Sequence, residues 1–242
     1  GARYLIITHD SYFPYLQTLA EWKNQKGYKA KVVTLSEIGG SDSASIRNYV
    51  VNAYNTWDIK PEYLLLVGNK SQIPFPKFFS NEFGGAFSDN FYTNVTGDFH
   101  NEIIPGRIWV YDTNQIKAVI AKIMSYDKNP FVQDTLWIKK GTTLVVEDNQ
   151  PPYSDSTYWA DTWFSQQLMT NAGFVKIDTF ALSLGDSSMG VVNAINEGRS
   201  YIQYRNQGVS NWHPPFDNIN TAQMGNGDKL PIIISGTCAT VE

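Results

Sequence analysis

Residues 29–68 of the chain, KAKVVTLSEIGGSDSASIRNYVVNAYNTWDIKPEYLLLVG, decide the fold. Apolar runs near both ends of this stretch predict two short strands. Between them Ile46, Val50 and Tyr54 recur at about one helical turn, which predicts an amphipathic helix. Strands joined by a helix are parallel neighbours in a sheet, because a parallel pair needs a connection long enough to hold one. The stretch therefore predicts a mostly parallel sheet with helices on both faces.

The same alternation extends in both directions. Before this stretch, residues 3–10 predict a strand and residues 12–28 a helix that stops at a glycine. The order starts again in the second half, with strands expected at 141–148, 174–180, 199–206 and 230–236 and helices at 156–173 and 189–198. We therefore predict an α/β protein with two tandem subdomains, residues 1–134 and 135–242. The two subdomains share the alternation of strands and helices but show no residue-level repeat.

Composition limits the class of protein. With 242 residues, 42% hydrophobic and 17% charged, the chain is long and apolar enough to bury a sizeable core. A net charge of −4 with scattered basic residues argues against a nucleic-acid partner. No apolar run approaches the length of a membrane span. The single cysteine excludes an internal disulfide and any metal site built from several cysteines.

Residues 69–106 interrupt the alternation with a polar, aromatic and glycine-rich stretch that is too long for a simple connection. It contains Asp89, Asp98 and Glu102 with asparagines between them. Oxygen-rich loops of this kind suit Ca²⁺, which would be structural here. Their spacing matches no EF-hand, and Asp and Asn also favour turns for reasons of their own. Both interpretations stay open.

The only cysteine, Cys238, lies in LPIIISGTCATVE, residues 230–242. It follows an apolar run that predicts a buried strand, and small polar residues surround it. A free cysteine is most often a small buried hydrophobe. At the carboxyl edge of a parallel sheet, where binding and catalytic sites collect, it is a candidate nucleophile. That role requires a base or a lowered pKa of the thiol, because the thiolate is the reactive form.

Four segments together resemble the gingipain family of cysteine peptidases, which have a caspase-like α/β fold. They are EWKNQKGYKAKVV (21–33), EYLLLVGNKSQIP (62–74), SDNFYTNVTGDFHNEIIPGR (88–107) and the strand that leads to the cysteine. The resemblance spans nearly the whole chain. It implies a peptidase that acts on peptides or proteins, outside the cell or on its surface. Family catalytic domains continue well past the cysteine, so residues 135–242 are expected to be a catalytic-type subdomain truncated at its C-terminus, with the missing part as a possible partner.

The main departure from the family lies in YRNQGVSNW, residues 204–212. Tyr204, Gly208 and Trp212 fit a family pattern in which the catalytic histidine follows the tyrosine, but Gln207 stands at the histidine position. A glutamine amide has no basic lone pair that titrates near neutral pH, whereas an imidazole does. His213, six residues later, is a candidate base from the same loop. The alternative is a surface histidine without a partner.

The resemblance also assigns roles to other residues. Cys238 is expected to attack the carbonyl, and the amide of Gly208 is a candidate donor to the oxyanion. Glu147 matches an acidic residue that orients the family's histidine, although Asp148 could serve equally.

Two further carboxylates and one arginine complete the assignment. Asp155 and Asp161 lie in the region of the acid that selects basic substrate side chains, but neither aligns cleanly. Arg107 matches a Gly-Arg pair of the family, and we interpret it as structural, tying its strand to nearby carbonyls or carboxylates.

The leading hypothesis is therefore a cysteine endopeptidase in which a histidine acts as base. A catalytically silent binding or assembly module is the alternative, with Gln207 marking the lost base; a silenced form of an active enzyme is a third. All of these predict that Cys238 and Gln207 lie side by side at the carboxyl edge of one parallel sheet.

Overall fold

The computed structural model describes the chain except for residues 79–85, 99, 148–154, 207–210 and 238–242. It contains two compact units, unit 1 (Gly1–Met124) and unit 2 (Ser125–Glu242), which we describe separately. Each unit has a four-stranded parallel sheet, so the predicted α/β class is confirmed. In the described residues no helix is both long and apolar enough to cross a membrane.

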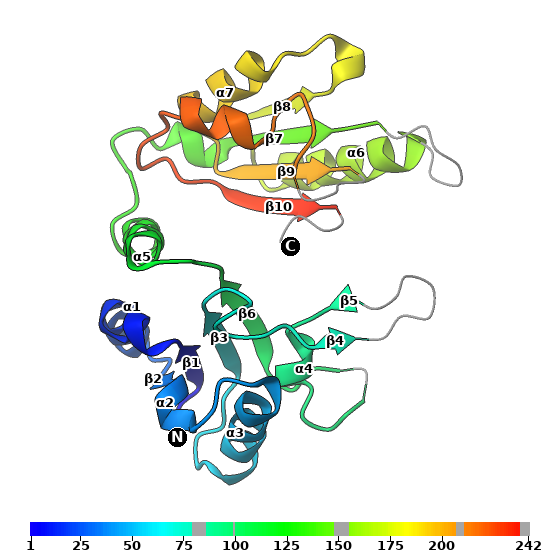
Figure 1. Ribbon diagram of the computed structural model, residues 1–242. Coiled ribbons are helices and arrows are strands. Elements are labelled where there is room, and N and C mark those ends of the chain that lie inside the picture. The colour runs from blue at the N-terminus through cyan, green and yellow to red at the C-terminus, as the bar shows by residue number, and fades with distance from the viewer. Residues whose placement is uncertain (79–85, 99, 148–154, 207–210, 238–242) are drawn as a thin grey trace. The chain divides into compact units, whose positions relative to one another are not determined.

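The sheet of unit 1 has the strand order β2-β1-β3-β6, and every neighbouring pair is parallel (Figure 1). Its strands are β1 (Tyr4–Thr8), β2 (Ala30–Thr34), β3 (Tyr63–Val67) and β6 (Ile104–Ile108). A separate two-stranded antiparallel ribbon pairs β4 (Lys77–Phe78) with β5 (Ala86–Phe87). The helices are η1 (Asp10–Tyr12), α1 (Phe13–Gln25), α2 (Leu35–Ile38), α3 (Ser43–Thr56), α4 (Asn90–Thr93) and α5 (Thr113–Lys128).

Helix α3 forms where the sequence predicts it. The Asp42 side chain caps its first turn by accepting the N–H groups of Ala44 and Ser45 at 3.0 Å. Its stripe of Ile46 and Val50 is fully buried against one face of the sheet. Helices α1 and α5 contribute to a second apolar cluster, which contains Ile6 of β1. The residues before and after Ile6 point to the opposite face of the sheet and belong to the first cluster. The central strand is therefore buried on both faces, as a parallel sheet requires.

The sheet of unit 2 has the order β10-β9-β7-β8, again with every neighbouring pair parallel. Its strands are β7 (Lys140–Val145), β8 (Lys176–Phe180), β9 (Tyr201–Arg205) and β10 (Ile232–Gly236). The helices are η2 (Leu136–Lys139), α6 (Asp155–Asn171), η3 (Leu182–Leu184), α7 (Ser188–Glu197) and η4 (Asn218–Gln223). Leu144 packs with α7 and the next residue, Val145, with Tyr158 of α6, so these helices cover opposite faces.

The boundary between the units lies at Met124, inside α5, rather than after residue 134. Ile116 and Ile120 of α5 are buried in the core of unit 1, so most of this helix belongs there. Asp134 forms an ion pair with Lys229 of unit 2 at 3.8 Å. Asp134 therefore belongs to unit 2, where its carboxylate has its partner.

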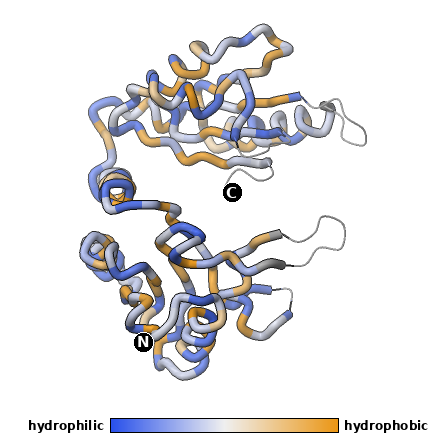
Figure 2. Tube along the Cα trace, in the orientation of Figure 1, coloured by the Kyte–Doolittle hydropathy of each residue, from blue (hydrophilic) through white to orange (hydrophobic). Residues whose placement is uncertain are grey.

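Strand β10 forms as predicted, but its predicted burial is wrong. Ile232, Ile233 and Ile234 are 51%, 51% and 48% exposed, and they form a hydrophobic run along the tube in Figure 2. β10 is an edge strand that pairs only with β9 in the described part of the sheet. Successive side chains of a strand point to opposite faces, so apolar surface is exposed on both faces of β10.

Arg107 anchors the irregular stretch that follows β3. Its Nε and Nη2 atoms bind the two carboxylate oxygens of Asp89 at 2.8 and 2.6 Å. Its Nη1 donates to the carbonyl oxygens of Gly68 and Ile73, both at 3.0 Å, and the guanidinium lies 4.2 Å from the centre of the Phe75 ring. The structural role predicted for Arg107 is confirmed.

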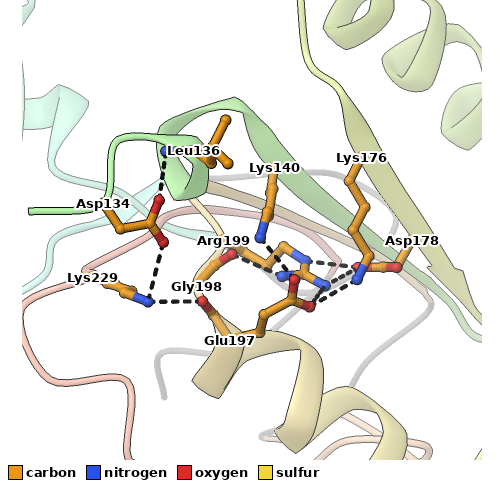
Figure 3. A network of polar contacts seen from close by, with 9 residues as sticks. All are labelled: Asp134, Leu136, Lys140, Lys176, Asp178, Glu197, Gly198, Arg199 and Lys229. Atoms are coloured by element: carbon orange, nitrogen blue, oxygen red, sulfur yellow. Dashed lines mark hydrogen bonds and ion pairs between the residues drawn. The ribbon is translucent and has the colours of Figure 1, made fainter.

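A second arginine, Arg199, organises the amino ends of the strands in unit 2 (Figure 3). Its side chain is 1% exposed, and its Nη2 contacts Asp178 at 2.5 Å and Glu197 at 3.0 Å. Lys140 and Lys176 each donate to Glu197 at 2.7 Å. Lys140 and Lys176 are the first residues of β7 and β8, and Arg199 lies two residues before β9. Glu197, the last residue of α7, thus connects this helix to the amino ends of three strands. No sequence motif indicated this network, because its members are scattered along the chain.

We expect Asp89→Asn to lower the free energy of unfolding by about 3 kcal/mol, since it leaves the buried charge of Arg107 uncompensated. The Arg107 side chain is only 8% exposed, so solvent compensates its charge poorly once the carboxylate charge is lost. Urea denaturation measures the change. The matched control is Asp58→Asn at an exposed position, which should change stability by no more than about 0.5 kcal/mol. Equal effects of the two variants would refute the anchoring role.

The Glu197 network predicts a pH dependence. Hydrogen bonds from Lys140 and Lys176 lower the pKa of Glu197 far below its ordinary value of 4.5. In the unfolded chain Glu197 takes up a proton near pH 4.5, whereas the folded state keeps it ionised, so its stabilisation is present at neutral pH and is lost as the pH falls below that value.

Glu197→Gln should therefore be less stable than the wild type at pH 7, and the difference should narrow from about pH 4.5 downward. Urea denaturation over this pH range measures it, with Glu21→Gln on the exposed face of α1 as control. A stability difference that is independent of pH would contradict the assignment.

Candidate active site

Three strands of unit 2 end level with one another at the carboxyl edge of the sheet. In the strand register, Val145 of β7 pairs with Arg205 of β9, and Arg205 pairs with Gly236 of β10. The backbone continues the match, because the N–H of Val146 donates to the Arg205 carbonyl at 3.1 Å. These three residues form a row across the edge, with neighbouring strands about 4.8 Å apart.

The predicted site residues follow directly from this row. Glu147, Gln207 and Cys238 each lie two residues beyond its members Val145, Arg205 and Gly236. Gln207 and Cys238, together with Gly208 and Asp148, lie outside the described residues. The adjacency of the two strands, on which the predicted pairing of Cys238 and Gln207 depends, is confirmed.

Glu147 is held at this edge by two donors from other elements. Its Oε1 accepts a hydrogen bond from Nε1 of Trp159 on α6 at 3.2 Å and another from the hydroxyl of Ser183 in η3. No sequence pattern indicated Trp159 or Ser183 as partners. A carboxylate oriented in this way can accept a hydrogen bond from a further group at the edge and so orient that group.

Tyr204 connects the end of β9 to the loop that carries His213. Its hydroxyl accepts hydrogen bonds from Nδ2 of Asn206 at 2.8 Å and from the backbone N–H of His213 at 2.7 Å. Its ring stacks on Trp212, with centroids 4.2 Å apart and planes 5° from parallel. Burial raises the pKa of the Tyr204 phenol, so the hydroxyl stays protonated at neutral pH.

Trp212 extends this arrangement to the strand that leads to the cysteine. Its Nε1 donates to Oγ of Ser235 on β10 at 2.9 Å. The loop after β9 therefore returns to the carboxyl edge, and the backbone of His213 lies beside the end of β9. The sequence pattern had singled out Tyr204 and Trp212, but not the bonding partners Asn206 and Ser235.

Of the two candidate specificity acids, Asp155 and Asp161, only Asp161 has a described side chain. The Asp161 carboxylate accepts a hydrogen bond from Nε of Arg205 at 2.7 Å. The same guanidinium donates to the Gly236 carbonyl at 3.2 Å and lies 4.1 Å from the centre of the Tyr158 ring. Asp161 is thus at the sheet edge but already carries a basic partner from its own chain. Asp155 begins α6, and its side chain lies outside the described residues.

The three carboxylates expected to bind Ca²⁺ have separate partners in unit 1. Both oxygens of Asp89 bind Arg107, Glu102 accepts the N–H groups of Val95 and Thr96, and Asp98 accepts that of His100 at 2.7 Å. The contacts of Glu102 and Asp98 are local ones typical of turns. Within the described parts of the chain, no cluster of three or more His, Cys, Asp or Glu side chains could hold a metal.

The chain was compared with known proteins. The model of the family described as Peptidase family C25 matches residues 1–242. Gingipain R2 of Porphyromonas gingivalis is 24% identical over 245 residues, which cover 98% of this chain and 32% of that protein. Lys-gingipain of the same species is 22% identical over 250 residues, which cover 99% of this chain and 14% of that protein.

The structural comparison agrees with these matches. The crystal structure of the Arg-specific cysteine proteinase gingipain R has a TM-score of 0.82 at 24% identity, over 98% of this chain and 54% of the solved one. This likeness confirms the fold. The chain thus spans about a third or less of the two relatives and about half of the solved structure. Since the family model matches every residue of it, the chain belongs to peptidase family C25.

Proposed function

We propose that this chain forms part of a cysteine endopeptidase of the gingipain type. The observation that carries the proposal is the level row Val145, Arg205 and Gly236 at the carboxyl edge of one parallel sheet. In the sequence each of these residues comes two positions before a candidate site residue, namely Glu147, Gln207 and Cys238. Carboxyl edges of parallel sheets are where active sites collect. Family membership and an oriented Glu147 support the same interpretation.

The proposed reaction proceeds through an acyl-enzyme. The Cys238 thiolate bonds to the carbonyl carbon of the peptide, and the oxyanion that forms accepts a hydrogen bond from the Gly208 amide. The protonated histidine gives its proton to the leaving amine as the C–N bond breaks. The same base then takes a proton from water, which cleaves the thioester and releases the acid. This sequence requires no cofactor.

His213 is the base in this proposal. Gln207 cannot take the proton, because an amide is not basic near neutral pH. The hydrogen bond from the His213 backbone to Tyr204 supports the assignment, since it holds this residue beside the end of β9. Gln207 also supports the second candidate function, a silent binding or assembly module that keeps the fold without the base.

We infer that the substrate is a peptide or protein. A basic substrate side chain that used Asp161 would have to displace the guanidinium of Arg205 from its 2.7 Å contact. Selectivity for arginine or lysine is therefore not the default expectation for this chain. A net charge of −4 gives no support for a nucleic-acid substrate.

We further propose that additional polypeptide completes the site next to β10. The half-exposed Ile232, Ile233 and Ile234 support this, because an apolar edge strand is a template for pairing and packing. A solved complex of the pro- and mature domains of RgpB from Porphyromonas gingivalis has a TM-score of 0.82 with this chain, so for that protein two domains have been seen together. The family resemblance supports an extracellular or cell-surface location.

The choice of base is tested by two substitutions in the full-length protein. We expect His213→Ala to lower peptide turnover by about 10²- to 10⁴-fold, the usual contribution of a general base, and to slow alkylation of Cys238. Gln207→His should change either rate little. A fluorogenic peptide library and an iodoacetamide time course are the readouts, with His100→Ala, at an exposed position in unit 1, as the control.

The opposite result has a definite meaning. If Gln207→His raises turnover while His213→Ala leaves it unchanged, then His213 is not the base, and position 207 is the position from which a base acts. If neither the wild type nor Gln207→His shows turnover or fast alkylation, the peptidase proposal fails and the binding-module function replaces it.

A further inference from the structure

One phenol oxygen binds a residue on each side of positions 207–210, one through its side-chain amide and the other through its backbone N–H. The Tyr204 hydroxyl accepts from Asn206, which immediately precedes this segment, and from the backbone N–H of His213, which lies three residues beyond it. Both donor–acceptor distances, 2.8 and 2.7 Å, are those of good hydrogen bonds. The side chains of Tyr204 and Asn206 are 0% and 3% exposed, so water cannot easily replace either partner.

The ring of the same tyrosine fixes the loop by packing. It stacks on Trp212 at a centroid distance of 4.2 Å, and Trp212 in turn contacts Phe216 edge-on at 6.1 Å. Aromatic pairs of these geometries are favourable beyond the apolar area that they bury. Tyr204 therefore uses its ring and its hydroxyl independently on one loop, and a substitution can remove one contribution without the other.

Trp212 relates this loop to the nucleophile strand. Its indole N–H donates to Ser235 at 2.9 Å, and Ser235 lies three residues before Cys238 on β10. The chain Ser235–Trp212–Tyr204–His213 thus runs from the strand before the thiol to the backbone of the candidate base. Each of its links is a described hydrogen bond or stacking contact.

We propose that Tyr204 is a positioning residue that sets the place of His213 relative to the thiol of Cys238. The inference rests on the proposed function, because it takes Cys238 as nucleophile and His213 as base. Reaction rates depend steeply on the relative placement of reacting groups, and a displacement of about 1 Å can cost about 10²-fold. A residue that touches no substrate can therefore control turnover.

The test is Tyr204→Phe in the full-length protein, which removes the hydroxyl and keeps the ring for stacking on Trp212. We expect kcat to fall by about 10- to 100-fold with little change in KM, because the bound substrate is unaffected. The pH profile of the Cys238 alkylation rate should have a higher midpoint, closer to the ordinary thiol pKa of about 8.5, because the imidazole moves away from the thiol. Hydrogen exchange of the His213 amide, measured by NMR, should become faster.

Two variants serve as controls. Tyr201→Phe makes the same change at a half-buried position of the same strand, away from the carboxyl edge, and should leave all three readouts within about twofold of the wild type. Ser235→Ala removes the acceptor of the Trp212 indole at an exposed position of β10 and should shift the alkylation profile in the same direction as Tyr204→Phe. It also keeps the proposal testable if Tyr204→Phe fails to fold.

The possible outcomes separate this inference from the proposed function. An alkylation profile shifted in both Tyr204→Phe and Ser235→Ala supports positioning, even if the wild type shows no turnover and the peptidase proposal fails. Faster exchange of the His213 amide with unchanged kcat and an unchanged profile would overturn positioning, because Tyr204 would then be a purely structural residue, while the peptidase proposal would stand.

Discussion

Parallel pairing of β7, β9 and β10 in one register is the constraint on which the candidate site depends. Because Val145, Arg205 and Gly236 are level, the three strands run in the same direction and end at the same height. An antiparallel strand would send its connection to the opposite edge, and a shift by one residue would turn each following side chain to the other face. Helices pack on both faces of the central strand β7 and so keep its register.

The two edges of the unit 2 sheet are stabilised by different chemistry. At the amino edge, Arg199 and the carboxylates around it form a dense charged network, in which Glu197 receives three cationic partners. At the carboxyl edge, the contacts around Tyr204 and Glu147 come largely from neutral donors. Preorganised neutral donors can stabilise charge that develops during a reaction, and at this edge they lie beside the single ion pair described there, Arg205–Asp161.

Position 207 and the pair Arg205–Asp161 show where this chain departs from its family resemblance. An amide stands at the position of the expected imidazole, and a guanidinium from β9 pairs with Asp161, one of the two candidate specificity acids. Both departures lie on or directly after the same strand end. The chemistry proposed for the site therefore depends on His213, a residue that the loop after β9 brings back to that strand end through backbone hydrogen bonding.

The sequence by itself determined the α/β class, the positions of most strands and helices, the stripe of Ile46 and Val50, and the structural role of Arg107, because these follow from local periodicity and residue chemistry. Only the tertiary structure decided that β10 is a half-exposed edge strand, that the boundary falls inside α5, and that Asp89 serves Arg107. It also decided the partners of Glu147 and Tyr204. Strand order, burial and side-chain pairing are set by contacts between residues far apart in the chain, which no local pattern encodes.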